Sequence, residues 1–132
     1  MEHNFQTYIT GLQHIGIPTN DMEATVAFYE TLGFEIAYET VIEAVGERVV
    51  FFRLGDTMVE AYENKQAALR NGAVDHFALN VTDIEAVFRL AKEKGLCILD
   101  EGIQSLPFWE NGVRFFSVAG PNKEKVEFNQ YL

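Results

Sequence analysis

The chain has 132 residues, a formal net charge of −10 and a single cysteine, Cys97. A hydrophobic content of 48% and an aromatic content of 13% can fill the core of one domain, which excludes a disordered chain. The negative charge disfavours nucleic acid and anionic lipid as partners, and no apolar run approaches the roughly 20 residues of a membrane span. One cysteine cannot form an internal disulfide, and its apolar neighbours predict a buried, inert thiol. The first ten residues lack the features of a signal peptide, so we expect a cytoplasmic protein.

The first half of the chain predicts a strand, a helix and three further strands. Alternating apolar and polar residues predict the first strand at residues 9–19. The helix is expected to begin after Asn20, a capping residue, and to end at Gly33. Its apolar stripe has helical spacing and consists of Met22, Val26, Tyr29 and Leu32. The further strands are expected at 34–43, 48–54 and 57–63, with the turn Gly55-Asp56 between the last two.

A polar segment, residues 64–72, connects this half to a second half with the same order of elements. A strand at 74–81 precedes a helix that begins with a capping box at Thr82 and ends at Gly95. The inner face of this helix consists of Ile84, Val87, Phe88 and Ala91. Further strands are expected at 96–101, 112–118 and 124–131, and a loop carrying Trp109 lies between the first two. The chain is therefore one domain, 1–132, made of two βαβββ modules that span about residues 9–63 and 73–131.

The two halves also share chemically important residues. An offset of 62 residues relates several pairs: His14 and His76, Asp21 and Asp83, Gly33 and Gly95. Each module then closes with an acid, since Glu60 follows His14 by 46 residues and Glu127 follows His76 by 51. A fixed offset between similar segments indicates an internal repeat.

Because side chains alternate along a strand, each of these four residues can be assigned to one face of its sheet. The apolar neighbours of each are expected to pack beneath the helices, so His14, His76, Glu60 and Glu127 face the opposite side of their sheets. If the two sheets curl toward each other, that side lines a cavity. Imidazole and carboxylate are ligands of zinc, nickel and iron. Two neutral imidazoles and two carboxylates around a divalent ion give a site with no net charge. The pattern therefore predicts a metal site.

Four segments carry a resemblance to a known family. They are LQHIGIPTNDMEATVAFYETLGF near the start, MVEAY closing the first module, VDHFALNV opening the second, and GPNKEKVEF at its close. Their order and spacing resemble the vicinal oxygen chelate superfamily, which includes glyoxalase I, extradiol dioxygenases, and fosfomycin and bleomycin resistance proteins. The resemblance covers essentially the whole chain. It implies an α+β fold in which the two modules form a cup-shaped half-barrel, and it implies a homodimer, which open strand edges also favour.

Within that superfamily, the order His, Glu, His, Glu is most similar to bacterial glyoxalase I. The resemblance implies that His14, Glu60, His76 and Glu127 hold one divalent metal ion, with nickel or zinc favoured and cobalt, manganese or iron as alternatives. It also implies a small-molecule substrate and a lactoylglutathione lyase type of reaction, in which a proton moves next to a carbonyl and the metal stabilises an enediolate. Glu127 is expected to be the catalytic base, with Glu60 as its near-symmetric partner.

The substrate is less defined by the resemblance. Asn64 matches an asparagine that contacts glutathione in family enzymes, but Pro18 stands where those enzymes carry an arginine that binds glutathione. Another α-hydroxy carbonyl or keto substrate is therefore also open. Arg53, Trp109 and Arg114 are further candidate substrate contacts.

Two other functions fit the same fold. The first is an Fe(II) ring-cleaving dioxygenase of the extradiol type, which the fourth ligand, Glu60, disfavours. The second is a non-catalytic protein that binds a small molecule and confers resistance. The ligands come either from one chain or from two swapped halves, and the short connection 64–72 is compatible with both arrangements.

Overall fold

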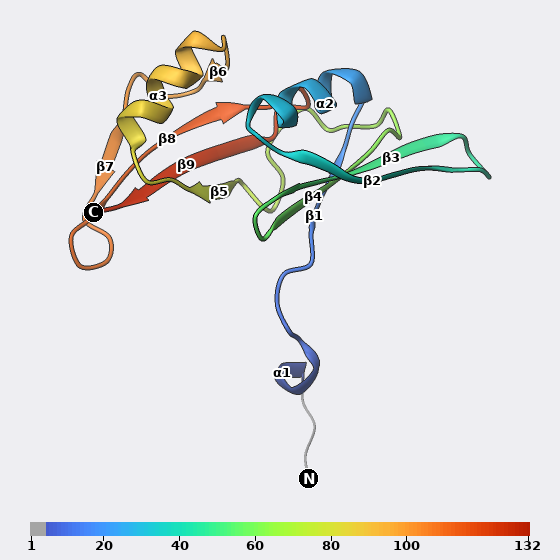
Figure 1. Ribbon diagram of the computed structural model, residues 1–132, viewed down its shortest axis with the longest axis horizontal. Helices are drawn as coiled ribbons and strands as arrows, with labels where there is room; N and C mark the ends of the chain where they lie inside the picture. Colours follow the sequence, from blue (N-terminus) through green and yellow to red (C-terminus); the bar gives the residue numbers. More distant parts are fainter. Residues whose placement is uncertain (1–4) are drawn as a thin grey trace.

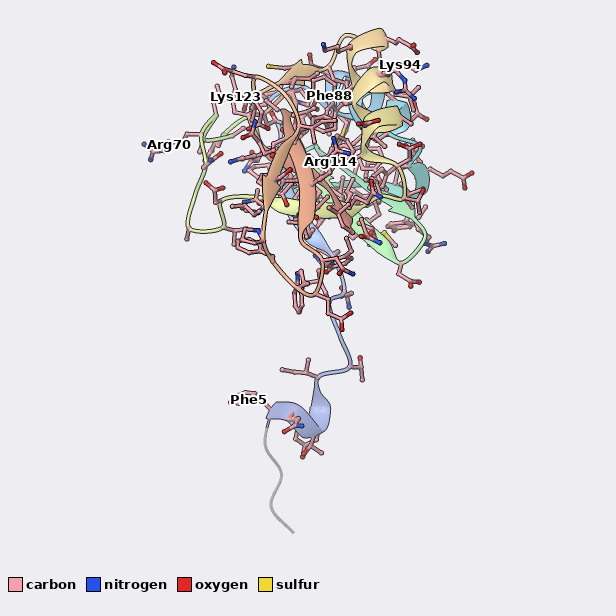
Figure 2. All side chains as sticks on the ribbon, turned by 90° about the vertical axis from the view of Figure 1, so that its left-hand side faces the viewer. Phe5, Arg70, Phe88, Lys94, Arg114 and Lys123 are labelled. Carbon is pink, nitrogen blue, oxygen red and sulfur yellow. The ribbon has the colours of Figure 1, made fainter. Side chains whose placement is uncertain are left out.

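The computed structural model describes residues 5–132, which form two β-sheets, each with one helix packed on it (Figure 1). The first module contains β1 (Ile15–Pro18), α2 (Met22–Thr31), β2 (Glu35–Ile42), β3 (Glu47–Leu54) and β4 (Thr57–Tyr62). The second contains β5 (Phe77–Asn80), α3 (Ile84–Glu93), β6 (Cys97–Ile98), β7 (Gln104–Leu106), β8 (Val113–Ala119) and β9 (Lys125–Tyr131). A short helix, α1 (Phe5–Tyr8), lies on a segment that projects away from the body in both views (Figures 1 and 2). None of the helices within residues 5–132 is long and apolar enough to cross a membrane.

The two sheets repeat one topology. The first has the order β1-β4-β3-β2, and the second has the order β5-β9-β8-β6, with β7 also paired to β8. In each sheet the first strand of the module lies at an edge and runs parallel to the last strand of the same module. This register places Gly16 beside Glu60 and Ala78 beside Glu127. The α+β class with two similar sheets is therefore confirmed, and β7 is an additional strand of the second module.

The helices bury the stripes that their spacing predicts. The fully buried side chains of α2 include Met22 and Tyr29, and those of α3 are Ile84 and Ala91. Both helices lie on the same side of the two sheets (Figure 1). Each forms its own hydrophobic cluster with the sheet beneath it. Four partly buried residues contact both clusters: Phe28, Leu32, Phe77 and Leu79. The two modules consequently share one continuous apolar contact.

The helices begin one residue later than predicted. The N-caps are Asp21 and Asp83, whose carboxylates each accept a hydrogen bond at 3.1 Å from the backbone N–H three residues later. An aspartate at this position satisfies an otherwise unpaired N–H and complements the helix dipole. Asn20 has a different role, because its Oδ1 accepts a hydrogen bond from the backbone N–H of Ala67 at 3.0 Å in the connection between the modules.

Three local expectations are wrong. Residues 9–14 are not a strand, since pairing with β4 begins only where Ile15 meets Val59. The loop between the second and third strands of the second module contains β7, which pairs with β8 through Gln104 and Phe115. Cys97 is exposed, because it lies on a two-residue strand at the edge of its sheet.

A buried polar contact joins the modules. The hydroxyl of Tyr29 on α2 donates to Oε2 of Glu124 at 2.9 Å, and the side-chain amide of Asn122 donates to the Thr25 hydroxyl at 3.1 Å. Burial raises the pKa of Tyr29 well above its usual value, and the adjacent Glu124 carboxylate raises it further. Burial also raises the pKa of Glu124. Helix α2 is therefore held to the turn that precedes β9 by groups that lose hydration in the folded state.

Candidate metal centre

In the first module, His14 and Glu60 face each other. His14 directly precedes β1, Glu60 lies in the parallel partner strand β4, and the distance from His14 Nε2 to Glu60 Oε1 is 3.2 Å. His14 Nδ1–H donates to Oε1 of Gln13 at 2.9 Å, because a side-chain amide oxygen can only accept. The ring also makes an edge contact with Phe51, with ring centroids 5.6 Å apart at 83°. These contacts orient the imidazole so that the Nε2 lone pair points toward the carboxylate.

The second module repeats this arrangement with His76 and Glu127. The distance from His76 Nε2 to Glu127 Oε1 is 3.7 Å. His76 Nδ1–H donates to Oδ2 of Asp75 at 2.9 Å, and this hydrogen bond holds the pKa of Asp75 below its usual value. Asn129 Nδ2 donates to Oε2 of Glu127 at 2.9 Å. The amide occupies one carboxylate oxygen, and the other is directed to the imidazole.

The donor atoms in each pair fit a divalent cation. With Nδ1 donating, a neutral imidazole presents a lone pair at Nε2, and the facing carboxylate oxygen is also an acceptor. Two acceptors in contact repel each other unless a proton or a cation accompanies them. A His that donates its other ring N–H to an oxygen acceptor is the arrangement found around metal-ligating imidazoles. Imidazole nitrogen and carboxylate oxygen also match the preferences of zinc, nickel, manganese and iron.

The structure brings the predicted ligands together in two pairs rather than in one group. Among the residues that it describes, no three His, Cys, Asp or Glu side chains are close enough to hold a metal ion within one chain. The predicted orientation of the ligands is nevertheless present, since the strand neighbours of Glu60 and Glu127 on β4 and β9 are buried beneath the helices. Each module therefore holds one His–Glu pair, and we call these pairs the first half-site (His14 and Glu60) and the second half-site (His76 and Glu127).

The predicted substrate contacts lie in different places. Arg53 is exposed on β3, and alternation from the buried Phe52 places it on the same face as the first half-site. The Oδ1 of Asn64 accepts a hydrogen bond from the backbone N–H of Gln66 at 2.9 Å and so stabilises a turn.

The placement of Arg114 argues against the contact predicted for it. Its side chain lies on the helix side of β8, where Nη2 is 3.2 Å from Oε1 of Glu85 on α3. This side is opposite to the second half-site, because alternation along β8 puts Arg114 with the buried Phe116. Arg114 is therefore a surface ion-pair residue in this structure, and we do not retain it among the substrate contacts.

Trp109 lies beside the second half-site. A cavity of 140 Å³ is lined by Ala78, Asn80, Phe108, Trp109, Val113, Asn129 and Tyr131. The rings of Trp109 and Tyr131 meet edge to face, with centroids 5.9 Å apart. Asn129 belongs both to this lining and to the hydrogen bond with Glu127.

Two supporting residues were missed at the level of sequence. Asp75 directly precedes His76, just as Gln13 directly precedes His14, so an oxygen acceptor before each histidine is itself part of the repeat. Asn129 lies two residues after Glu127 in β9, and strand alternation places it on the same face. The acceptor before each histidine and the position of Asn129 were both readable in the sequence. Their spacing alone does not show that they form hydrogen bonds with His76 and Glu127.

Comparison with known proteins defines the family. Residues 11–128 match the Glyoxalase/Bleomycin resistance protein/Dioxygenase superfamily, and the chain belongs to this superfamily. It is 30% identical over 140 residues to the uncharacterized protein YwbC of Bacillus subtilis (strain 168), with coverage of 90% of this chain and 96% of that protein.

Solved structures show the same fold. A glyoxalase family protein from Enterococcus faecalis superposes with a TM-score of 0.78 at 23% identity, covering 92% of this chain and 98% of that one. The fosfomycin resistance protein FosX from Listeria monocytogenes, complexed with Mn(II) and sulfate, gives 0.74 at 16% identity, covering 94% of each chain. Lactoylglutathione lyase from Agrobacterium tumefaciens gives 0.69 at 18% identity, covering 92% of this chain and 94% of that one. The superfamily thus includes enzymes and a divalent metal complex on this fold.

Proposed function

We propose that this chain is a metal-dependent enzyme that transfers a proton next to a carbonyl group, in the manner of lactoylglutathione lyase. The observation that supports this most directly is the pair of half-sites, each with an imidazole oriented by a neighbouring oxygen and a carboxylate facing its Nε2. Membership of a superfamily that includes lactoylglutathione lyase is consistent with it. Four protein ligands also favour this chemistry over ring cleavage by iron, for which Glu60 has no assigned role.

The residues have separate roles in this proposal. His14, Glu60, His76 and Glu127 would hold one divalent ion, which would supply Lewis acidity at the site. Glu127 accepts the proton from one carbon and returns it to the neighbouring carbon. The hydrogen bond from Asn129 fixes one oxygen of Glu127, and the other would accept the proton once Glu127 is released from the ion. Glu60 occupies the corresponding position in the first module.

We also propose that a homodimer assembles each complete site, with the first half-site from one chain and the second half-site from its partner. One chain keeps the two pairs apart, whereas a bound divalent ion needs three or four protein ligands. The edge strands β1 and β5, which directly follow His14 and His76, have a paired neighbour on one side only in the described chain. Phe5, which is 85% exposed on the projecting segment (Figure 2), and Leu12, which is 81% exposed, add apolar surface that a partner can cover.

Mixing two inactive variants tests this assembly. His14→Ala removes a ligand from the first half-site, and His76→Ala removes one from the second. After subunit exchange, half of the dimers contain one chain of each kind, and each such dimer has one intact site. About a quarter of the wild-type activity is therefore expected to return. If sites form within single chains, mixing restores nothing, and the dimeric assembly is wrong.

The proposed reaction is tested in D₂O. Proton transfer next to a carbonyl exchanges that hydrogen with solvent, so deuterium entering the α-carbon can be followed by NMR without knowledge of the product. The probes are the hemithioacetal of methylglyoxal and glutathione, and the simple α-hydroxy ketone hydroxyacetone. We expect metal-loaded wild type to accelerate exchange of at least one probe and Glu127→Gln not to. Equal exchange with both proteins, or no acceleration of either probe, would contradict the proposal.

A further inference from the structure

Three aromatic side chains are exposed together at one end of the second sheet. Trp109 is 76% exposed, Tyr131 is 60% exposed and Phe108 is 54% exposed. Large apolar side chains that gather at a hollow on the surface of a domain mark a site of recognition more often than scattered ones do. These three line the 140 Å³ cavity beside the second half-site, which we call the aromatic pocket.

The backbone holds Trp109 in an unfavourable conformation. Its φ angle is +64°, in the left-handed region that a bulky L-residue rarely adopts. The loop is fixed to the end of the chain by two hydrogen bonds: Leu132 N–H donates to the Gly112 carbonyl at 3.1 Å, and Asn111 Nδ2 donates to the Leu132 carbonyl at 3.3 Å. Strain of this kind persists where the surrounding structure enforces it, and it concentrates at ligand sites. The loop therefore presents the indole above Tyr131 at a cost in folding free energy.

The aromatic pocket opens on the face that carries Glu127. Ala78, which lines the pocket, is the register partner of Glu127 in the parallel pair β5–β9. Asn129 lines it too, and its amide holds one oxygen of Glu127. A group bound in the pocket therefore lies next to the carboxylate that the proposed reaction uses as its base.

The lining defines what the aromatic pocket can bind. An apolar cavity of about 150 Å³ accommodates benzene, so 140 Å³ suits one six-membered ring. None of the described residues that line it is charged, and its only amide groups belong to Asn80 and Asn129. Nothing in it offsets the charge of a carboxylate, phosphate or phosphonate. Two aromatic rings at an angle of 83° provide a face and an edge for a planar group.

We propose that the aromatic pocket binds the planar, uncharged group of the substrate, which makes the substrate an aryl-substituted α-hydroxy carbonyl compound. As an assignment of substrate class this rests on the proposed function, but as a binding site it can be tested without turnover. The side chains that select the planar group are Trp109 and Tyr131, and the amide of Asn129 links the pocket to Glu127.

The chain contains one tryptophan, so its fluorescence reports directly on the aromatic pocket. Two neutral α-hydroxy ketones serve as probes: 2-hydroxyacetophenone carries a phenyl ring, and hydroxyacetone carries a methyl group in its place. We expect 2-hydroxyacetophenone to quench the emission saturably, after correction for its absorbance, and to bind at least tenfold more tightly than hydroxyacetone. Calorimetric titration of both probes gives the same comparison independently of fluorescence.

Variants that remove one ring at a time test whether binding of the aryl probe depends on Trp109 and Tyr131. Tyr131→Ala keeps the fluorescent reporter, and Trp109→Ala is measured by calorimetry. Each is expected to weaken binding of 2-hydroxyacetophenone about tenfold, which corresponds to the loss of one aromatic contact. The control is Val45→Ala, which truncates an exposed apolar side chain in the turn between β2 and β3 and should leave binding unchanged.

The outcomes separate this inference from the proposed function. Preferential binding of the aryl probe supports the aromatic pocket even if no deuterium exchange occurs, in which case the proposed reaction alone fails. Exchange of hydroxyacetone without preferential binding of the aryl probe overturns the aromatic pocket alone. Emission that changes with protein concentration but not with either probe would also overturn it, and would indicate that a second copy covers the three rings.

Discussion

The two half-sites have the same skeleton and different surroundings. In both, a histidine just before an edge strand faces a glutamate on the parallel strand beside it, and an oxygen acceptor directly before the histidine receives its Nδ1–H. The acceptor is the neutral amide of Gln13 in the first half-site and the carboxylate of Asp75 in the second. The repeat has therefore kept the geometry of the His–Glu pair and varied the charge of the group that accepts the Nδ1–H.

The two glutamates also differ in how exposed they are and in what they contact. The side chain of Glu127 is 13% exposed and accepts a hydrogen bond from Asn129, whereas that of Glu60 is 24% exposed and faces Phe51 on the adjacent strand. The second half-site also borders the aromatic pocket. A carboxylate that is more enclosed, oriented by an amide and adjacent to a substrate pocket is better suited to proton transfer. The comparison therefore favours Glu127 over Glu60 as the base of the proposed reaction.

The largest expected effect is that of replacing each glutamate in turn. Glu127→Gln should lower turnover about 100-fold to 10,000-fold, the usual contribution of a positioned general base. Glu60→Gln should lower it less, because Glu60 serves mainly as a ligand. Metal content and thermal stability of both variants are the controls. Equal losses, or a larger loss for Glu60→Gln, would remove the functional asymmetry between the half-sites.

The next effect concerns Gln13 and Asp75, the oxygen acceptors that receive the Nδ1–H of the two histidines. Asp75→Asn should weaken metal affinity about 10-fold to 100-fold, because a carboxylate increases the basicity of the imidazole that it accepts from. Gln13→Ala should weaken it less, since a neutral amide contributes orientation but no charge. Competition titrations with a metal-binding dye give both values. A similar loss in the two variants would mean that the charge on Asp75 is unimportant.

A pH-dependent effect is expected where the two modules meet, at Glu124. Burial raises the pKa of Glu124 in the folded state. Its contribution to the free energy of unfolding is therefore fully present below the unfolded pKa, about 4.3, and is lost as the pH rises through the raised folded pKa. The stability of wild type relative to Glu124→Gln should accordingly fall from pH 4 to pH 7. Urea denaturation of both proteins across this range measures the difference, and a constant value would contradict the burial argument.

The smallest effect is at the starts of the two helices, where the modules again differ by a charge. The carboxylate of Glu63 accepts a hydrogen bond from the first N–H of α2 at 2.7 Å, and the amide of Gln130 accepts the equivalent one from α3 at 2.8 Å. A negative charge at a helix N-terminus contributes about 0.3–1 kcal/mol. Glu63→Gln should lower the free energy of unfolding by about this amount, and Gln130→Glu should raise it. Opposite signs in denaturant unfolding would show that other contacts of these side chains dominate.

The sequence predicted the internal repeat, and it also predicted the face of the sheet on which each candidate ligand lies. The second prediction was possible for one physical reason. Alternation is a property of every strand, and the buried neighbours of Glu60 and Glu127 specify the face of each glutamate without reference to the rest of the fold. Helix faces were predictable on the same basis. The helix starts were displaced by one residue because Asn20 and Asp21 are both good caps, and only the tertiary contact of Asn20 with Ala67 distinguishes them.

The other features of the site depend on contacts between segments that are far apart in the sequence, and residue spacing does not reveal such contacts. Whether the half-sites meet within one chain depends on how the modules pack, which the connection 64–72 does not determine. Arg114 was predicted as a substrate contact, whereas in the structure it pairs with Glu85 on the side of β8 that carries the buried Phe116. The environment of Trp109 depends on β7 and on the hydrogen bonds between its loop and Leu132, neither of which leaves a periodic pattern.

The most direct test of the account is the metal content of protein purified without an affinity tag, measured for wild type and for His14→Ala and His76→Ala. Each dimer with two complete sites binds two ions, so we predict about one divalent ion per chain in the wild type. Each variant removes one of the four ligands from every site, so we expect most of this metal to be lost during purification. Wild-type protein that holds no metal and takes up none on addition would contradict the four-ligand site. Retention of the ion by either variant would contradict the claim that the two half-sites bind it together.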